Sequence, residues 1–339
     1  MPGIPVVLDV DTGVDDACAL LLAARHPALD LRAVSCVAGN AALDDVVRNT
    51  LVVLETAGRG DVPVGRGAPR PLLEAARPAR HVHGLDGMGD LGLPAPTGRP
   101  DARHAVTLLH DVLLEAADLG APVVLVPLGP MTNIALLLRM YPEAARGLSR
   151  IVFMGGTARV GNATAAAEFN VVHDPEAAAV VLDAATGLGV PVTMYGLDVF
   201  YDVRVTRARA RELVAQTDPA ARLAGRLVGF QCDRFGVGDA TIGDAGAVCA
   251  VVDPEGLTTA RSPVRVELSG AWTRGQTVVD SRPAALDRDH DPLGTAAALV
   301  DVALAVDGDR YARLWLDTVT GAVSAGDGPR SPTAAPPPG

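Results

Sequence analysis

The chain has 339 residues, of which 49% are hydrophobic and 20% are charged, enough for one large α/β domain. Its formal net charge of −11 offers no basic footprint for nucleic acid, and no apolar run reaches the roughly 18 residues of a membrane span. Because the opening MPGIPVVLDV also lacks the basic start of a signal peptide, we expect a cytoplasmic protein that binds neither nucleic acid nor membranes.

Short apolar runs alternate with Ala- and Leu-rich stretches over the first 200 residues. Strands are predicted at 5–10, 31–39, 121–130, 149–156 and 190–195. Helices are predicted at 15–26, 43–58, 104–118, 131–142 and 175–185. This alternation predicts an α/β fold with a doubly wound, mostly parallel central sheet and helices on both faces.

The pattern changes after residue 200. An Arg-rich amphipathic helix is predicted at 206–230, a Gly-rich loop at 236–246, and a last helix at 295–318. The stretches VRVELSG and QTVVD predict a small antiparallel hairpin near the C-terminus. We expect one domain over residues 1–325 and a disordered Pro- and Ala-rich tail over 326–339.

The cysteines and the basic residues argue against metal–thiolate, disulfide and lysine chemistry. The four cysteines are scattered without a C-x-x-C pair, so they predict buried packing residues rather than a zinc site or disulfides: Cys18, Cys36, Cys232 and Cys249. All 29 basic residues are Arg, which excludes any mechanism that needs a lysine amine.

The carboxyl ends of the predicted parallel strands indicate where a ligand binds. In open α/β sheets, ligands lie beyond these ends. The loops expected to meet there are 9–16, 39–41, 81–90, 127–133, 155–170 and 198–202.

Four aspartates crowd the first strand-to-helix junction: Asp9, Asp11, Asp15 and Asp16. Carboxylates in a first helical turn complement the helix dipole, which accounts for Asp15 and Asp16 but not for the other two. Four carboxylates this close repel one another unless some are protonated or a cation neutralises them. Oxygen ligands of this kind suit Ca²⁺, so the cluster favours a metal site.

A phosphatase of the haloacid-dehalogenase type also begins with D-x-D after a strand. Such enzymes have Thr or Val two residues after the second aspartate, where this chain has Gly13. They also use a lysine, which this chain lacks. The phosphatase interpretation is therefore disfavoured.

Five stretches, in this order, resemble the nucleoside hydrolases, the inosine-uridine-preferring nucleoside N-ribohydrolases. They are VVLDVDTGVDDACAL, the GN at 39–40, HVHGLDGMGD, VPLGPMTNIA and MGGTARVGNATAAAEFNVVHDPEAA, and the resemblance runs from about residue 5 to residue 318. It implies Ca²⁺-dependent hydrolysis of the N-glycosidic bond of ribonucleosides to free base and ribose. It also implies a homodimer or homotetramer and a role in purine or pyrimidine salvage.

By that resemblance, the Ca²⁺ ligands are Asp11, Asp16, the backbone carbonyl of Leu128, and Asp244 in TIGDAGAV. Asp11 is also the implied general base, which activates a metal-bound water. The residues implied to bind substrate are Asp15, Asn40, His83, Met154, Asn162, Glu168, Phe169 and Asn170.

Several residues keep a structural alternative. Asn40 could be a turn residue and Phe169 could be core packing, while Asn133 is interpreted as a helix-start residue outside the site. Asp174 is expected to cap a helix that begins at Pro175. Asp198 supports either the site or a plain strand-end turn.

The chain departs from the family pattern in two places. Thr12 stands where many members have Pro, and Gly243 stands where members that accept both purine and pyrimidine nucleosides often have the His that protonates the leaving base. The candidates for that proton are His81, His83, Tyr201 and Arg234. Two alternatives to ordinary turnover stay open: a catalytically weak nucleoside- or ribose-binding protein, and a member acting on an atypical N-riboside.

Overall fold

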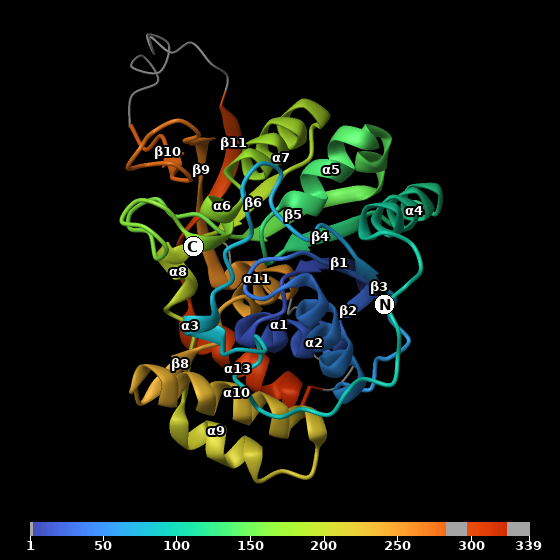
Figure 1. Ribbon diagram of the computed structural model, residues 1–339, viewed down its shortest axis with the longest axis vertical. Coiled ribbons are helices and arrows are strands. Elements are labelled where there is room, and N and C mark those ends of the chain that lie inside the picture. Colours follow the sequence, from blue (N-terminus) through green and yellow to red (C-terminus); the bar gives the residue numbers. More distant parts are fainter. Residues whose placement is uncertain (1–2, 283–296, 324–339) are drawn as a thin grey trace, which may run out of the picture.

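A nine-stranded sheet crosses the described part of the computed structural model, residues 3–282 and 297–323 (Figure 1). The strand order is β10-β9-β11-β6-β5-β4-β1-β2-β3. The strands are β1 (Ile4–Val10), β2 (Leu29–Cys36), β3 (Val64–Arg66), β4 (Val123–Pro127), β5 (Leu148–Met154), β6 (Val192–Tyr195), β9 (Leu257–Val266), β10 (Thr277–Val279) and β11 (Ala298–Val306). The pairs from β3 to β11 are parallel, whereas β9 and β10 continue the sheet in antiparallel pairs.

Helices cover both faces of this sheet, as predicted (Figure 1). One face carries α1 (Val14–Arg25), α2 (Leu43–Thr56), α10 (Pro219–Phe235), α11 (Ala245–Val252) and α13 (Gly308–Val319). The other carries α4 (Ala105–Asp118), α5 (Thr132–Met140) and α7 (Pro175–Leu188). In β1, Leu8 belongs to the first core and Val7 to the second, because successive strand side chains point to opposite faces.

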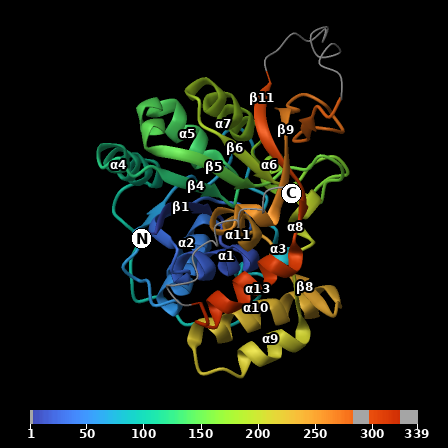
Figure 2. The ribbon, with the colours of Figure 1, turned by 180° about the vertical axis from the view of Figure 1, so that it is seen from behind.

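Shorter elements lie at the ends of the sheet. They are α3 (Arg80–His83), η1 (Pro142–Gly147), α6 (Phe169–His173), α8 (Leu197–Phe200), β7 (Arg204–Thr206), α9 (Arg207–Val214), β8 (Asp239–Thr241) and η2 (Pro254–Gly256). Strands β7 and β8 form a separate antiparallel ribbon. From behind, α13 lies beside α1, α10 and α11 (Figure 2).

Three predicted elements after residue 200 are wrong. The helix expected at 206–230 is two helices, because Asp218 caps a new helix that has Pro219 in its first turn. The helix expected at 295–318 is the strand β11 followed by α13, with residues 295–296 outside the described part. Its ALVDVALAV segment alternates buried and exposed side chains, as a strand does. The Gly-rich loop at 236–246 contains β8 and the start of α11.

Other predictions are confirmed. The β9–β10 hairpin is antiparallel, with Thr277 opposite Val266. The four cysteines are free and buried. Among the described residues, no helix is both long enough and apolar enough to cross a membrane. The predicted tail at 326–339 lies outside the described residues, and the single domain over 1–325 stays a prediction.

Candidate active site

A cavity of about 390 Å³ opens at the carboxyl ends of the central strands. From β1, the chain continues through β2 and β3 on one side of the sheet and through β4, β5 and β6 on the other. Loops diverge at such a switch point and leave room for a ligand. The cavity is lined by ten of the twelve predicted site residues: Asp15, Asn40, His83, Leu128, Met154, Asn162, Glu168, Phe169, Asn170 and Asp244.

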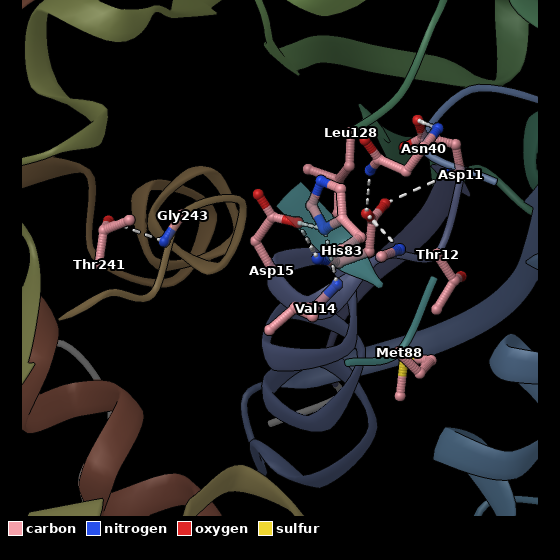
Figure 3. A network of polar contacts seen from close by, with 12 residues as sticks. Asp11, Thr12, Val14, Asp15, Asn40, His83, Met88, Leu128, Thr241 and Gly243 are labelled. Carbon is pink, nitrogen blue, oxygen red and sulfur yellow. Dashed lines mark hydrogen bonds and ion pairs between the residues drawn. The ribbon is translucent and has the colours of Figure 1, made fainter. Parts of the chain in front are cut away.

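The remaining two, Asp11 and Asp16, are fully buried beside the cavity. Asp11 Oδ2 accepts the backbone N–H of Asn40 at 2.7 Å (Figure 3). Asp16 accepts the N–H groups of Asp11 (3.2 Å) and Gly13 (2.9 Å) and the Asn40 side-chain amide (3.2 Å). The carboxylate of Asp16 therefore fastens the turn between β1 and α1, and Asn40 is part of the site rather than a turn residue alone.

Two glycines allow this close packing around Asp11. A Cβ at Gly39 would lie 2.0 Å from Asp11 Oδ2, and a Cβ at Gly129 would lie 2.7 Å from Asp11 Oδ1. Any larger residue at either position would displace the carboxylate. Glycine at positions 39 and 129 therefore allows the backbone to approach Asp11 closely on both sides.

The buried carboxylates hold their protons unusually tightly. Burial, with a further contribution from neighbouring Asp15, raises the pKa of Asp16 to about 7. Burial and the adjacent Asp16 charge raise the pKa of Asp11, and burial with the Asp15 charge raises that of Asp244. Within the described part of the chain, Asp11 Oδ1 has no hydrogen-bond partner. An oxygen without a partner among mutually repelling carboxylates is suited to a cation.

The residues fit a hard metal ion. Carboxylate oxygens of Asp15, Asp16 and Asp244 lie within 4.8 Å of one another. This group includes Asp15, which the sequence assigned to ribose, and omits Asp11, whose carboxylate lies beside Asp16. An all-oxygen donor set of this charge suits Ca²⁺ or Mg²⁺ better than a softer metal.

The loop after β4 meets the first turn of α6 at the cavity wall. The Asn170 side-chain amide donates to the Leu128 carbonyl at 2.7 Å and to the Met154 carbonyl at 3.2 Å. The Leu128 N–H donates to the Asp9 carbonyl at 2.7 Å, which fixes the Leu128 peptide at the end of β4. The Leu128 carbonyl is thus held at the cavity wall.

Glu168 caps the short helix α6 from inside the site. Its carboxylate accepts the N–H groups of Asn170 (2.8 Å), Gly156 (3.0 Å) and Val171 (3.1 Å). Burial raises the pKa of Glu168 to about 7 despite these hydrogen bonds. The same side chain therefore orders the loop and presents an acid at the cavity.

His83 lies between helix α1 and the cavity. Its Nδ1 accepts the Val14 N–H at 3.2 Å and lies 3.7 Å from Asp15 Oδ1 (Figure 3). Burial lowers the pKa of His83, so the neutral ring carries its proton on Nε2. This supports the interpretation of His83 as a pocket residue.

Asn133 lies at the start of α5 and does not line the cavity, as predicted, but it also has a partner that the prediction did not include. Its amide donates to Asp9 Oδ1 at 2.8 Å and to the Cys36 carbonyl at 3.0 Å, and its Oδ1 accepts the Ala68 N–H at 2.8 Å. It thereby ties together β1, β2 and the segment after β3. The signal for this was Asp9 itself, a strand carboxylate that needs a polar partner when buried.

Other candidates have structural positions. Asp174 caps α7 through the Ala177 N–H, as predicted. Asp198 accepts the Ala158 N–H at 2.7 Å and so holds the loop after β5. Arg234 donates to the His81 carbonyl and does not line the cavity, whereas His81 and Tyr201 do.

The chain is similar in sequence to known enzymes. Residues 6–313 match the family described as "Inosine-uridine preferring nucleoside hydrolase". The chain is 41% identical over 282 residues to the pyrimidine-specific ribonucleoside hydrolase RihA of Enterobacter sp. (strain 638), covering 82% of this chain and 88% of the relative.

Solved structures agree with the family match. A plant nucleoside hydrolase, the PpNRh1 enzyme, has a TM-score of 0.85 at 29% identity and covers 94% of this chain and 99% of its own. An inosine-guanosine nucleoside hydrolase has a TM-score of 0.83 at 30% identity and covers 93% and 98%.

The fold, the buried carboxylates and these relatives define an enzyme that hydrolyses N-glycosyl compounds. The chain belongs to the inosine-uridine preferring nucleoside hydrolase family, and its activity is the hydrolysis of ribonucleosides. Membership in this family excludes the phosphatase interpretation.

Proposed function

We propose that the chain hydrolyses ribonucleosides in a Ca²⁺-dependent reaction with Asp11 as general base. The observation that carries this proposal is the buried group of Asp11, Asp16 and Asp244, in which Asp11 Oδ1 lacks a hydrogen-bond partner among the described residues. A pure binding protein has no need of such a base beside its sugar site. In this proposal Asp11, Asp16, Asp244 and the Leu128 carbonyl hold the ion, with Asp15 close enough to contribute.

When bound, the ion lowers the pKa of a water molecule and orients it together with the sugar hydroxyls. Asp11 takes a proton from the attacking water as the water oxygen bonds to C1′ of the ribose. The C1′–N bond breaks, and its electron pair passes to the base. Buried carboxylates around the sugar stabilise the oxocarbenium-like centre that develops at C1′.

The other predicted residues form the sugar pocket. In this proposal Asp15 and Asn40 bind ribose hydroxyls, and Asn162, Glu168 and Asn170, which line the same cavity, bind the others. Met154, Phe169 and the neutral ring of His83 complete the wall. The side chains proposed to bind the ribose hydroxyls are polar, whereas Met154, Phe169 and His83 exclude water. This combination is typical of small-molecule sites.

The relatives' names point to different bases. One is named pyrimidine-specific and one inosine-guanosine. We therefore propose ribonucleosides as the substrate class, with an atypical N-riboside as the alternative. The expected dimer or tetramer stays a prediction.

The test is ribose release from uridine, cytidine, inosine, guanosine and adenosine after treatment with EDTA, and again with added Ca²⁺ or Mg²⁺. Release restored by Ca²⁺ supports the proposal. Release that survives stripping of all metal overturns the metal dependence. Tight binding of ribonucleosides without release, under every condition, overturns catalysis and favours the binding alternative.

A further inference from the structure

The position where related enzymes carry a catalytic His has no space for a side chain in this chain. Gly243 has a φ of +54°, which disfavours residues with a side chain. A Cβ there would lie 2.6 Å from Asp15 Cβ and 2.9 Å from Phe200 Cζ. The Phe200 ring therefore occupies the space beside residue 243, and the proton for the leaving base must come from elsewhere.

The segment that carries Phe200 is bound directly to the loop that carries Gly243. The Thr241 hydroxyl donates to the Phe200 carbonyl at 2.7 Å, and the Ile242 N–H donates to the Val203 carbonyl at 3.1 Å. The Thr241 hydroxyl also accepts the Gly243 N–H at 3.0 Å (Figure 3). A group on this neighbouring segment can therefore reach the same side of the cavity.

Tyr201 is the next residue on that segment and lines the cavity. Its ring packs edge-on against Phe200, with the ring centres 5.1 Å apart. Arg204 Nε donates to the Tyr201 carbonyl at 2.8 Å, which fixes the turn after α8. The Phe200 ring thus supports the tyrosine ring and Arg204 fixes its backbone, although 43% of the residue is exposed.

The hydroxyl of Tyr201 shares the cavity with the side chain of Asn162. Asn162 Oδ1 accepts the Phe169 N–H at 2.9 Å, so this amide is held at the cavity wall. A phenol that faces the cavity can donate its hydrogen to a ligand there. Burial, together with the charges of Glu168 and Asp15, raises the pKa of Tyr201 and keeps the phenol protonated.

The other donors near this end are committed elsewhere. Arg204 pairs with Asp239 at 2.8 Å, and the Thr241 hydroxyl is used by Phe200. Gln231 carries an amide, which is not an acid at neutral pH. The remaining competitors are His81, which is exposed at the rim, and His83, whose ring lines the cavity.

We propose that the Tyr201 hydroxyl protonates the leaving base, in place of the missing His. This inference rests on the proposed hydrolytic mechanism. As the C1′–N bond breaks, its electron pair passes to the base and the phenol proton transfers to a base heteroatom. The water oxygen bonds to C1′ and one water proton goes to Asp11. Asp11 then releases this proton to solvent, and the tyrosinate regains a proton from solvent. The net reaction adds one water and yields ribose and neutral base.

The test compares two substrates in the full-length, metal-loaded enzyme. Uridine or inosine needs a proton on its leaving base, whereas 4-nitrophenyl β-D-ribofuranoside releases a stable phenolate without one. Tyr201→Phe keeps the ring and removes the hydroxyl. We expect kcat for nucleosides to fall by roughly 100- to 10,000-fold, the usual contribution of a general acid, with little change for the nitrophenyl riboside.

Tyr141→Phe is the matched control, since that tyrosine packs on His110 away from the cavity and should leave both rates unchanged. Equal losses of Tyr201→Phe on both substrates, or no loss, would overturn the assignment. So would a nucleoside-selective loss in His81→Ala or His83→Ala instead. Wild-type enzyme inactive on both substrates would reject the proposed function itself, which separates the two failures.

Discussion

The two ends of the cavity are built differently. At the inner end, Asp11, Asp16 and Asp244 are almost completely buried and lie at strand ends and helix starts. At the outer end, Tyr201 is 43% exposed and Phe235 is 56% exposed. In the proposed function the inner end binds the ribose, which all ribonucleosides share, and the outer end binds the base, which varies. A buried sugar site would then adjoin a more exposed base site.

The largest effect is expected for Asp11→Asn, which tests whether the inner end acts in the same way on every ribonucleoside. The amide keeps the shape but cannot take a proton from water. We expect kcat to fall by at least roughly 100- to 10,000-fold for every base, while ribonucleoside binding is retained. Steady-state ribose release and calorimetric titration with a nucleoside measure the two effects. Asp61→Asn, at a surface aspartate paired with Arg59, is the control. Normal turnover in the Asp11 variant would reject its role as base.

The next largest effect is expected at the metal. Asp244→Ala removes a buried carboxylate that lies within 4.8 Å of its partners in the acidic cluster. We expect Ca²⁺ affinity to fall by more than the roughly 10- to 100-fold that loss of an outer-shell partner produces. Calcium titration of chelator-stripped protein measures this, with Asp61→Ala as the control. Unchanged Ca²⁺ affinity would remove Asp244 from the site.

The inner end was also the part that the sequence could predict. Parallel strands place their carboxyl ends at one edge, so Asp11, Asn40 and Leu128 converge although they are far apart in the chain. Alternation of apolar strands and helices was sufficient to predict β1, β2, β4, β5 and β6, but not the three-residue edge strand β3. The site roles themselves still await the experiments above.

The outer end and the C-terminal elements were harder for physical reasons. The segment that forms β11 is rich in Ala and Leu, and its alternation only becomes evident when β6 and β9 pair with it. Helix periodicity alone predicted one helix across Asp218, but Asp218 caps a second helix that begins at Pro219. The lack of space for a side chain at residue 243 results from a positive φ and from the nearby Phe200 ring. The spacing of residues in the sequence reveals neither.

A pH measurement tests whether Glu168 belongs to the buried end. Its pKa is about 7 in the folded chain against an ordinary 4.5, so the folded state binds this proton more tightly than the unfolded state. The free energy of unfolding of metal-free protein should therefore fall as pH rises from 4.5 to about 7. Glu168→Gln, which cannot ionise, should reduce that fall by about 3 kcal/mol.

Urea unfolding at several pH values between 4 and 8 gives this difference. Asp9 and Asp16 also have pKa values raised to about 7, so a fall of the same sign should persist in the variant. Glu115→Gln removes an exposed carboxyl on α4 and serves as the control. Parallel pH profiles for wild type and Glu168→Gln would show that Glu168 has no raised pKa in the folded protein.

The smallest effects are expected at two buried asparagines that hold different parts of the cavity. Asn133 ties Asp9 to Cys36 and Ala68 at the inner end. Asn49 joins the turn after Asp11 to the loop after His83, because it donates to the Thr12 carbonyl at 3.3 Å and to the Asp86 carbonyl at 2.8 Å. Each alanine variant leaves buried polar groups unpaired, which costs about 1–3 kcal/mol of stability.

Their kinetic consequences should differ. Asn133→Ala should lower kcat by a similar factor for all bases, since it loosens the strand ends around Asp11. Asn49→Ala should in addition change the ratio of purine to pyrimidine kcat/KM, since it also frees the loop that follows His83. Melting temperatures and the five-nucleoside panel measure both. If the two variants shift the base profile equally, the cavity behaves as one unit and the division into a fixed sugar end and an adaptable base end is wrong.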